Sequence, residues 1–112
     1  MTVRVVTYDD SQSVGSRLPI LVRAELRTIA SVTSTVTLPA TGDYVAFIGA
    51  SGVVTLPTAV GNKYQYTLKN VDTTNKTVST TSSQTIDGST TATLPPNWSI
   101  NVISDGANWR VV

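Results

Sequence analysis

Short runs of Val and Thr, separated by turn-forming residues, recur along most of this chain and constrain its fold more than any other feature. The 112 residues include 16 Val, 19 Thr and 6 Ile, but only one Phe, one Met and two Trp. Branching at Cβ restricts χ1 and favours the pleated strand over the helix. The composition therefore predicts an all-β fold whose core is built mainly from small and medium-sized side chains.

From Ser31 onward, these runs return about every 8 to 12 residues, a spacing typical of β-sandwiches and barrels. The sequence therefore predicts a small antiparallel β-sandwich or barrel-like module. The expected strands are 32–38, 43–48, 53–56, 63–70, 76–80, 90–94, 98–103 and 109–112.

Two kinds of turn signal separate the runs. Asp87-Gly88 and Asp105-Gly106 predict tight hairpin turns, because Gly accepts a positive φ at low cost. The tripeptide Thr-Leu-Pro occurs three times, and because Pro cannot continue a β-ladder, each copy predicts a strand end whose Leu points inward. The copies are 18 and 38 residues apart, so we interpret them as a recurrent strand end and do not infer a solenoid. They lie at Thr37–Pro39, Thr55–Pro57 and Thr93–Pro95.

The first quarter of the chain differs in charge from the rest. It holds four of the eight basic residues, whereas the remainder carries few charges. We therefore divide the chain into an extended N-terminal arm, residues 1–34, and a β-rich module, residues 35–112. The candidate residues for docking onto an acidic partner surface are Arg4, Arg17, Arg23 and Arg27.

The segment 20–29 within this arm has two interpretations. Apolar and polar side chains alternate along it, which favours a strand, but Val22, Leu26 and Ile29 also fit one face of a helix. We favour the strand because its pattern is longer.

Missing residue types exclude several functions. The chain has no His and no Cys, which removes imidazole bases, catalytic triads, thiol nucleophiles, zinc clusters and disulfides. The seven acidic residues mostly lie beside turn residues and resemble turn formers. We therefore expect no enzymatic activity, no cofactor and no metal.

The charge and hydropathy pattern excludes two classes of partner. A net charge of +1 with 13% charged residues does not supply the basic stripe that nucleic-acid binding needs. Apolar stretches fall well short of the roughly 20 residues of a membrane span, and the start of the chain lacks the apolar region of a secretory signal. We therefore expect neither nucleic-acid nor membrane binding.

Four pieces of sequence, in order, resemble a module of tailed-bacteriophage virion appendages. They are Val53–Ala59, Gly61–Val71 with its Tyr-Thr-Leu-Lys-Asn strand, Ile86–Gly88 and Val102–Trp109 with its Ser-Asp-Gly-Ala-Asn-Trp ending. The resemblance extends over about residues 35–112. The family occurs on tail fibres, baseplates, head fibres and capsid decoration proteins, usually as β-rich homotrimers.

The resemblance implies a non-enzymatic virion structural protein. Its N-terminal arm, with the four arginines, would bind the particle, and its β-rich module would face outward. On this interpretation the chain is a capsid decoration or head-fibre protein, assembled in the host cytoplasm, whose partners are its own copies in a homotrimer and the phage major capsid protein or another virion protein. The alternative is a tail fibre or baseplate module that binds a host receptor or surface glycan.

Exposed aromatic side chains would be the contacts for such a ligand or for a protein interface. The candidates are Trp98, which follows two prolines, and Tyr64 and Tyr66 in an alternating strand. Trp109 alternates with Arg110 in the last expected strand, so we expect it in the core.

Overall fold

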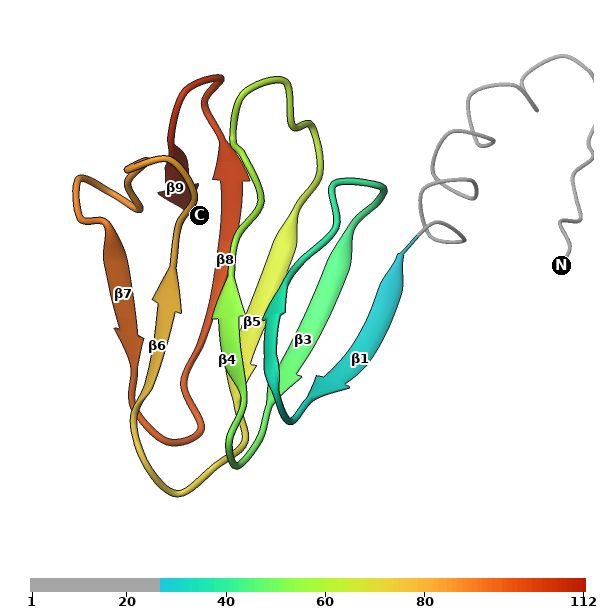
Figure 1. The fold of residues 1–112 in the computed structure, drawn as a ribbon, viewed down its shortest axis with the longest axis vertical. Coiled ribbons are helices and arrows are strands. Elements are labelled where there is room, and N and C mark those ends of the chain that lie inside the picture. Colours follow the sequence, from blue (N-terminus) through green and yellow to red (C-terminus); the bar gives the residue numbers. More distant parts are fainter. Residues whose placement is uncertain (1–26) are drawn as a thin grey trace, which may run out of the picture.

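In the computed structural model, which describes residues 27–112, strands alternate between two sheets that pack face to face (Figure 1). The all-β fold is confirmed for these residues. The five-stranded sheet has the order β1 (Thr28–Val32), β3 (Tyr44–Ile48), β5 (Tyr66–Asn70), β8 (Ser99–Ser104) and β9 (Trp109–Val111). The four-stranded sheet has the order β2 (Thr35–Thr37), β4 (Val53–Thr55), β6 (Lys76–Ser79) and β7 (Thr91–Leu94).

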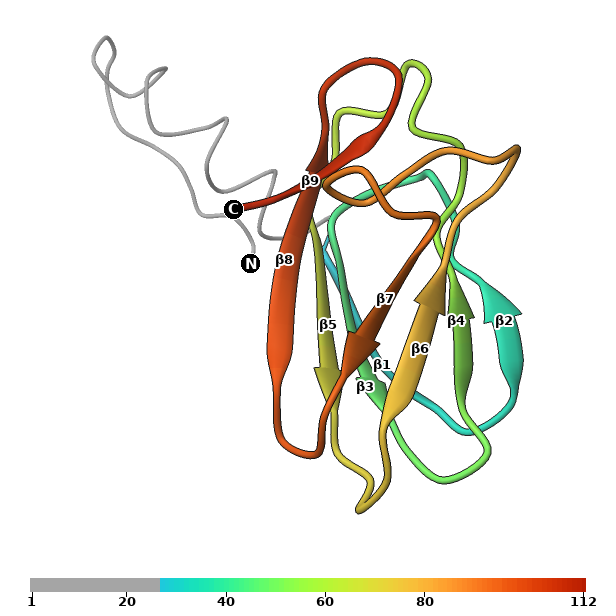
Figure 2. The ribbon, with the colours of Figure 1, turned by 90° about the vertical axis from the view of Figure 1, so that its left-hand side faces the viewer.

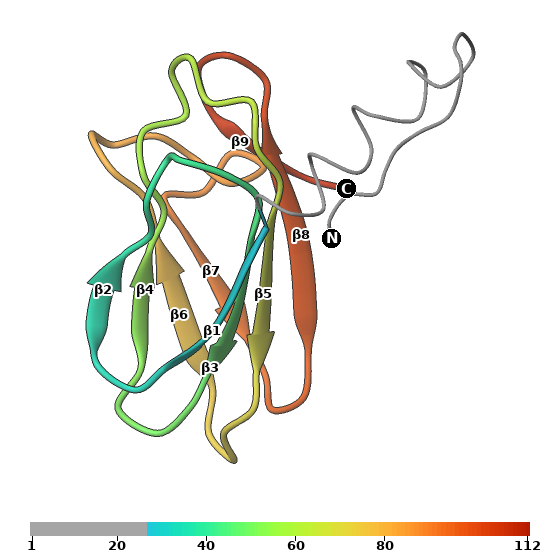
Figure 3. The ribbon, with the colours of Figure 1, turned by 90° about the vertical axis from the view of Figure 1, so that its right-hand side faces the viewer.

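Both sheets are mixed, so the expectation of an antiparallel module is wrong. The pairs β1–β3, β3–β5, β2–β4 and β4–β6 are parallel, and only β5–β8, β8–β9 and β6–β7 are antiparallel. The reason lies in the connections: each of the first five strands is followed by one in the opposite sheet. The chain runs along one sheet in one direction and returns along the other, so each strand from β3 to β6 lies beside the strand two positions earlier (Figure 3).

The spacing of the first two Thr-Leu-Pro copies reflects this winding. Thr37 lies opposite Thr55 in the β2–β4 register, so the 18-residue spacing is one full circuit through both sheets. The first six strands thus wind as a short β-solenoid, which we did not infer from the sequence, and the antiparallel strands β7, β8 and β9 complete the two sheets. The inward-pointing leucines are confirmed, since Leu38, Leu56 and Leu94 are all buried.

The two sheets lie face to face (Figure 2). Alternation along the strands places one face of each sheet in a shared core. Tyr66 and Trp109 are its largest side chains, and their rings meet edge to face with centroids 5.2 Å apart. The expected core position of Trp109 is confirmed. The other buried hydrophobic residues are Val32, Leu38, Ala46, Ile48, Val54, Leu56, Ala59, Leu68, Val78, Ile86, Leu94 and Val102.

Both Asp-Gly pairs form tight turns. The turn at Asp105-Gly106 joins β8 to β9, and the Asp105 amide donates to the Asn108 carbonyl at 2.9 Å. Asp87 and Gly88 have φ of 49° and 92°, as a type I′ turn requires, and Ile86 and Ser89 close it with reciprocal backbone bonds. The Asp87-Gly88 turn lies inside the β6–β7 connection and does not itself join two strands.

The start of the described chain belongs to the sheet. β1 pairs with β3 over five residues, so residues 28–32, which the sequence assigned to the arm, are part of the sandwich. Thr28 and Ile29 lie in β1, but the rest of the segment 20–29, apart from Arg27, lies outside the described residues, as do Arg4, Arg17 and Arg23.

Candidate functional site

Trp98 lies on the turn between β7 and β8, and 62% of its surface is exposed. Its amide donates to the Pro95 carbonyl at 3.1 Å, and Asn97 has φ of 68°. Proline at the second position of a turn and a positive φ at the third define a type II turn, in which Asn is one of the tolerated residues. The sequence Pro95–Trp98 therefore fixes the backbone that presents the indole.

Hydrogen bonds to β5 hold this turn in place. The Asn97 amide donates to the Asn70 carbonyl at 3.0 Å, and the Asn70 amide donates to the Trp98 carbonyl at 2.9 Å. The Lys69 ammonium donates to the Asn97 carbonyl at 2.6 Å. The sequence analysis missed the roles of Lys69 and Asn97, although Pro-Asn before an aromatic residue is a recognisable type II turn signal.

Tyr66, by contrast, is fully buried, so its interpretation as a surface contact residue is corrected. Its hydroxyl donates to the Pro39 carbonyl at 2.9 Å and accepts from the Asn62 side-chain amide at 3.0 Å. Burial raises the pKa of this phenol, which therefore stays protonated. The residue serves the core because its strand begins at Tyr66 with that side chain facing inward.

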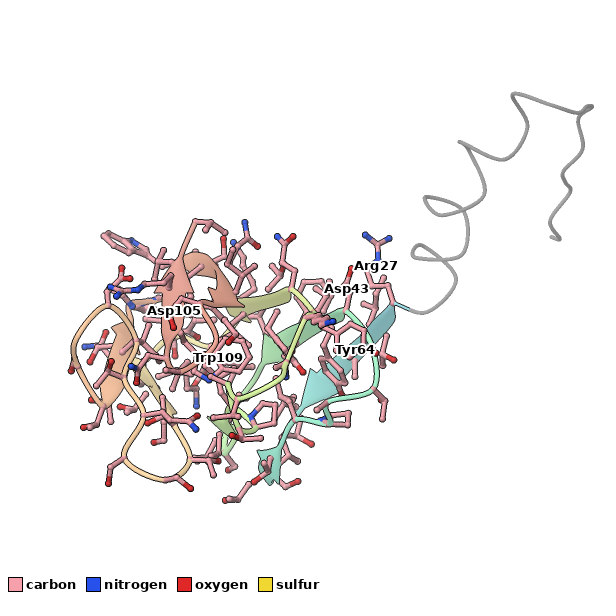
Figure 4. The ribbon with its side chains drawn as sticks, turned by 90° about the horizontal axis from the view of Figure 1, so that it is seen from above. Arg27, Asp43, Tyr64, Asp105 and Trp109 are labelled. Atoms are coloured by element: carbon pink, nitrogen blue, oxygen red, sulfur yellow. The ribbon has the colours of Figure 1, made fainter. Side chains whose placement is uncertain are left out.

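Tyr64 is half-buried and packs against the core cluster, with its amide donating to the Asn62 side-chain oxygen at 2.9 Å. Figure 4 places Tyr64, Asp43 and Arg27 toward the β1 side of the molecule and Trp109 away from them. Arg27 is exposed just before β1. The structure therefore does not bring Tyr64 and Trp98 into one site, because Trp98 lies at the β7–β8 turn.

Two acidic residues of the described chain, Asp105 and Asp72, accept hydrogen bonds within local turns. Asp105 accepts from the amides of Ala107 and Asn108 and from the Arg110 guanidinium, at 2.9–3.0 Å. Asp72 accepts from the Lys76 ammonium at 3.0 Å and from the Thr74 hydroxyl at 2.9 Å. Within residues 27–112, no group of three or more acidic residues is placed to hold a metal ion.

These bonds predict an acid-sensitive step in stability. The amides of Asn108 and Ala107 lower the pKa of Asp105 to about 2, and the Lys76 side chain does the same for Asp72, from an ordinary value of 3.8. A carboxyl whose pKa is lower in the folded state stabilises it above the unfolded value and loses that contribution as pH falls through the folded value. We therefore expect the free energy of unfolding, measured by urea titration, to fall between about pH 4 and pH 2.

Asp105→Asn provides the control for this titration. The amide oxygen still accepts backbone bonds but does not titrate, so the variant should lose part of the pH dependence over the same interval. An identical slope in both proteins would contradict the assignment to Asp105.

Comparisons with known proteins yield no relative. No model of a known protein family, no curated protein and no solved structure matches this chain. The phage-module resemblance therefore rests on the motif residues alone and stays a prediction.

Among residues 27–112, no helix is long and apolar enough to cross a membrane.

Proposed function

We propose that this chain is a non-enzymatic structural protein of a tailed-phage virion, a capsid decoration or head-fibre protein that acts as a homotrimer. Its N-terminal residues bind the major capsid protein or another virion protein, and the β-sandwich faces outward. The proposal places the protein in the virion after assembly in the host cytoplasm.

The observation that carries this proposal is the placement of the four motif pieces in one folded unit. Val53–Ala59 contains β4 and its proline exit, Gly61–Val71 contains β5, Ile86–Gly88 lies in the tight turn, and Val102–Trp109 spans the β8–β9 hairpin. β5 and β8 are neighbours in one sheet, and Ile86 bridges to Trp109. Pieces that are separate in sequence therefore belong to one connected module, as the resemblance requires.

The first test counts copies of the chain in purified virions relative to the major capsid protein. Hundreds of copies per particle are expected for a decoration or head-fibre protein, whose many modest contacts act together. A full-length variant with Gln in place of Arg4, Arg17, Arg23 and Arg27 should fold normally but bind particles more weakly, most clearly at low salt. Unchanged particle binding by this variant would reject the basic residues as the anchor.

The exposure of Trp98 supports one alternative, a tail fibre or baseplate module that binds a host receptor or glycan. A flat indole held on a fixed turn is suited to stacking against a sugar ring. A few to a few tens of copies per virion would favour this function. Trp98→Ala should then reduce adsorption of virions to host cells while leaving the unfolding curve unchanged.

A further inference from the structure

The outer face of the four-stranded sheet carries a regular array of hydroxyl groups. β2, β4, β6 and β7 lie side by side (Figure 2), and two outward positions on each strand line up with those of its neighbours. All of these side chains except Val53 end in a hydroxyl, and we call the set the threonine array. Its first row is Thr35, Val53, Thr77 and Thr93, and its second row is Thr37, Thr55, Ser79 and Thr91.

The hydroxyls of the threonine array are available to bind something outside the chain. Within residues 27–112, none of them makes a hydrogen bond to another residue of the protein. Hydroxyls elsewhere in the chain are used internally: Thr81 donates to the Leu56 carbonyl at 2.8 Å, and Ser104 donates to the Ala59 carbonyl at 2.6 Å. Each hydroxyl offers one donor and two acceptor sites, so the array presents unused hydrogen-bonding groups to its surroundings.

The threonine array carries no charge, in contrast to the outer face of the other sheet. Lys69 in β5 and Arg110 in β9 are outward positions of that second face. A charged side chain must give up strongly held water before a surface can cover it, and this costs free energy. The array has no such cost, so its chemistry suits a neutral partner that exchanges hydrogen bonds as water does.

The backbone sets the spacing of the threonine array. Neighbouring strands lie about 4.8 Å apart, and side chains two residues apart on one strand are separated by about 6.6 Å. Oxygen atoms at the surface of hexagonal ice repeat on a grid of similar dimensions. Branching at Cβ restricts χ1 of Thr and Val, so most of the array holds its spacing with little further loss of conformational freedom on binding.

We propose that the threonine array binds ice. Its hydroxyls form hydrogen bonds with water molecules of the lattice, and its methyl groups lie against the ordered water between them. Val53 fits the array because it has the shape of Thr without the hydroxyl. The inference goes beyond the proposed function and does not depend on it. Several copies on one particle bind more tightly than a single chain, because the later contacts become intramolecular.

The experiment measures how the full-length protein partitions between slowly growing ice and the remaining liquid. Growing ice excludes most solutes, so enrichment of the chain in the ice, relative to an inert protein in the same solution, reports binding. The wild type is expected to be enriched. Thr77→Lys places a long charged side chain in the middle of the array and should remove the enrichment.

Ser31→Lys is the matched control for Thr77→Lys. Ser31 is an exposed hydroxyl residue in β1, on the outer face of the five-stranded sheet, so the substitution adds the same charge away from the array. It should partition as the wild type does.

A second array variant keeps the proposal testable if Thr77→Lys does not fold. Thr37 is exposed on the edge strand β2, where a lysine is well tolerated. Thr37→Lys should also lose the enrichment, and urea unfolding establishes that each variant is folded.

Two results would overturn the proposal. Exclusion of the wild type from growing ice rejects ice binding by this chain. Wild-type enrichment in a folded Thr77→Lys or Thr37→Lys shows that another surface binds the ice. Both results leave the virion role untouched, because the copy number in virions tests that role independently.

Discussion

Trp109→Ala is expected to lower the free energy of unfolding by about 3–5 kcal/mol, as for other buried large aromatic residues. Trp109 is fully buried, and its ring contacts Tyr66 edge to face. Its indole NH donates to the Pro57 carbonyl at 3.3 Å, which links β9 to the loop after β4. Apart from Tyr66, the rest of the core consists of Val, Leu, Ile and Ala, so few neighbouring side chains are large enough to fill the cavity.

Urea unfolding at a fixed protein concentration measures this loss, since association changes apparent stability. Trp98→Ala is the matched control: it removes the same side chain from an exposed turn and should change stability by less than about 0.5 kcal/mol. Equal losses in the two variants would contradict the core assignment of Trp109.

Local alternation predicted the strands from β3 onward and showed which side chains of each strand share a face. In β5, Tyr66, Leu68 and Asn70 point inward, whereas Thr67 and Lys69 are partly exposed, as a period of two requires. The prolines after Leu38, Leu56 and Leu94 mark strand ends because a residue without an N–H cannot extend a ladder. These signals are local, so one sequence is enough to read them.

Alternation and proline positions do not show whether neighbouring strands run parallel or antiparallel. A strand alternates in the same way whether its neighbour is parallel or antiparallel, so the pattern of β3 does not reveal its parallel pairing with β1 and β5. The informative signal was the 18-residue separation of Thr37 and Thr55 along the sequence, because these two residues are register partners in the parallel pair β2–β4. The third copy of the tripeptide obscured it, because β7 pairs antiparallel with β6.

The sequence predicted the exposed Trp98 of the candidate site but not the burial of Tyr66, because local patterns do not show how the two sheets pack. The prolines before Trp98 indicated a loop and exposure, but alternation alone did not say that Tyr66 would face the core. Which face of β5 is covered depends on the four-stranded sheet packed against it. That packing also buries polar side chains, which sequence analysis did not identify as structural.

Asn70 is the buried polar residue with the largest expected effect. Its side-chain amide donates to the Thr74 carbonyl at 2.7 Å and the Leu94 carbonyl at 2.8 Å, and its side-chain oxygen accepts from the Asp72 amide at 2.8 Å. These bonds connect β5 of one sheet to the β5–β6 connection and to the end of β7 in the other. One side chain therefore ties together both layers at the end of the sandwich that also presents Trp98.

Asn70→Leu keeps a similar volume but removes all three side-chain bonds. The Leu94 carbonyl would become a buried acceptor without a partner, which costs about 1–3 kcal/mol, and the two partly buried bonds are lost as well. We therefore expect a loss of about 2–3 kcal/mol in urea unfolding. Asn75→Leu, at an exposed position in the same connection, is the control and should have little effect. Wild-type stability in Asn70→Leu would mean that packing of apolar side chains alone holds the two sheets together at this end.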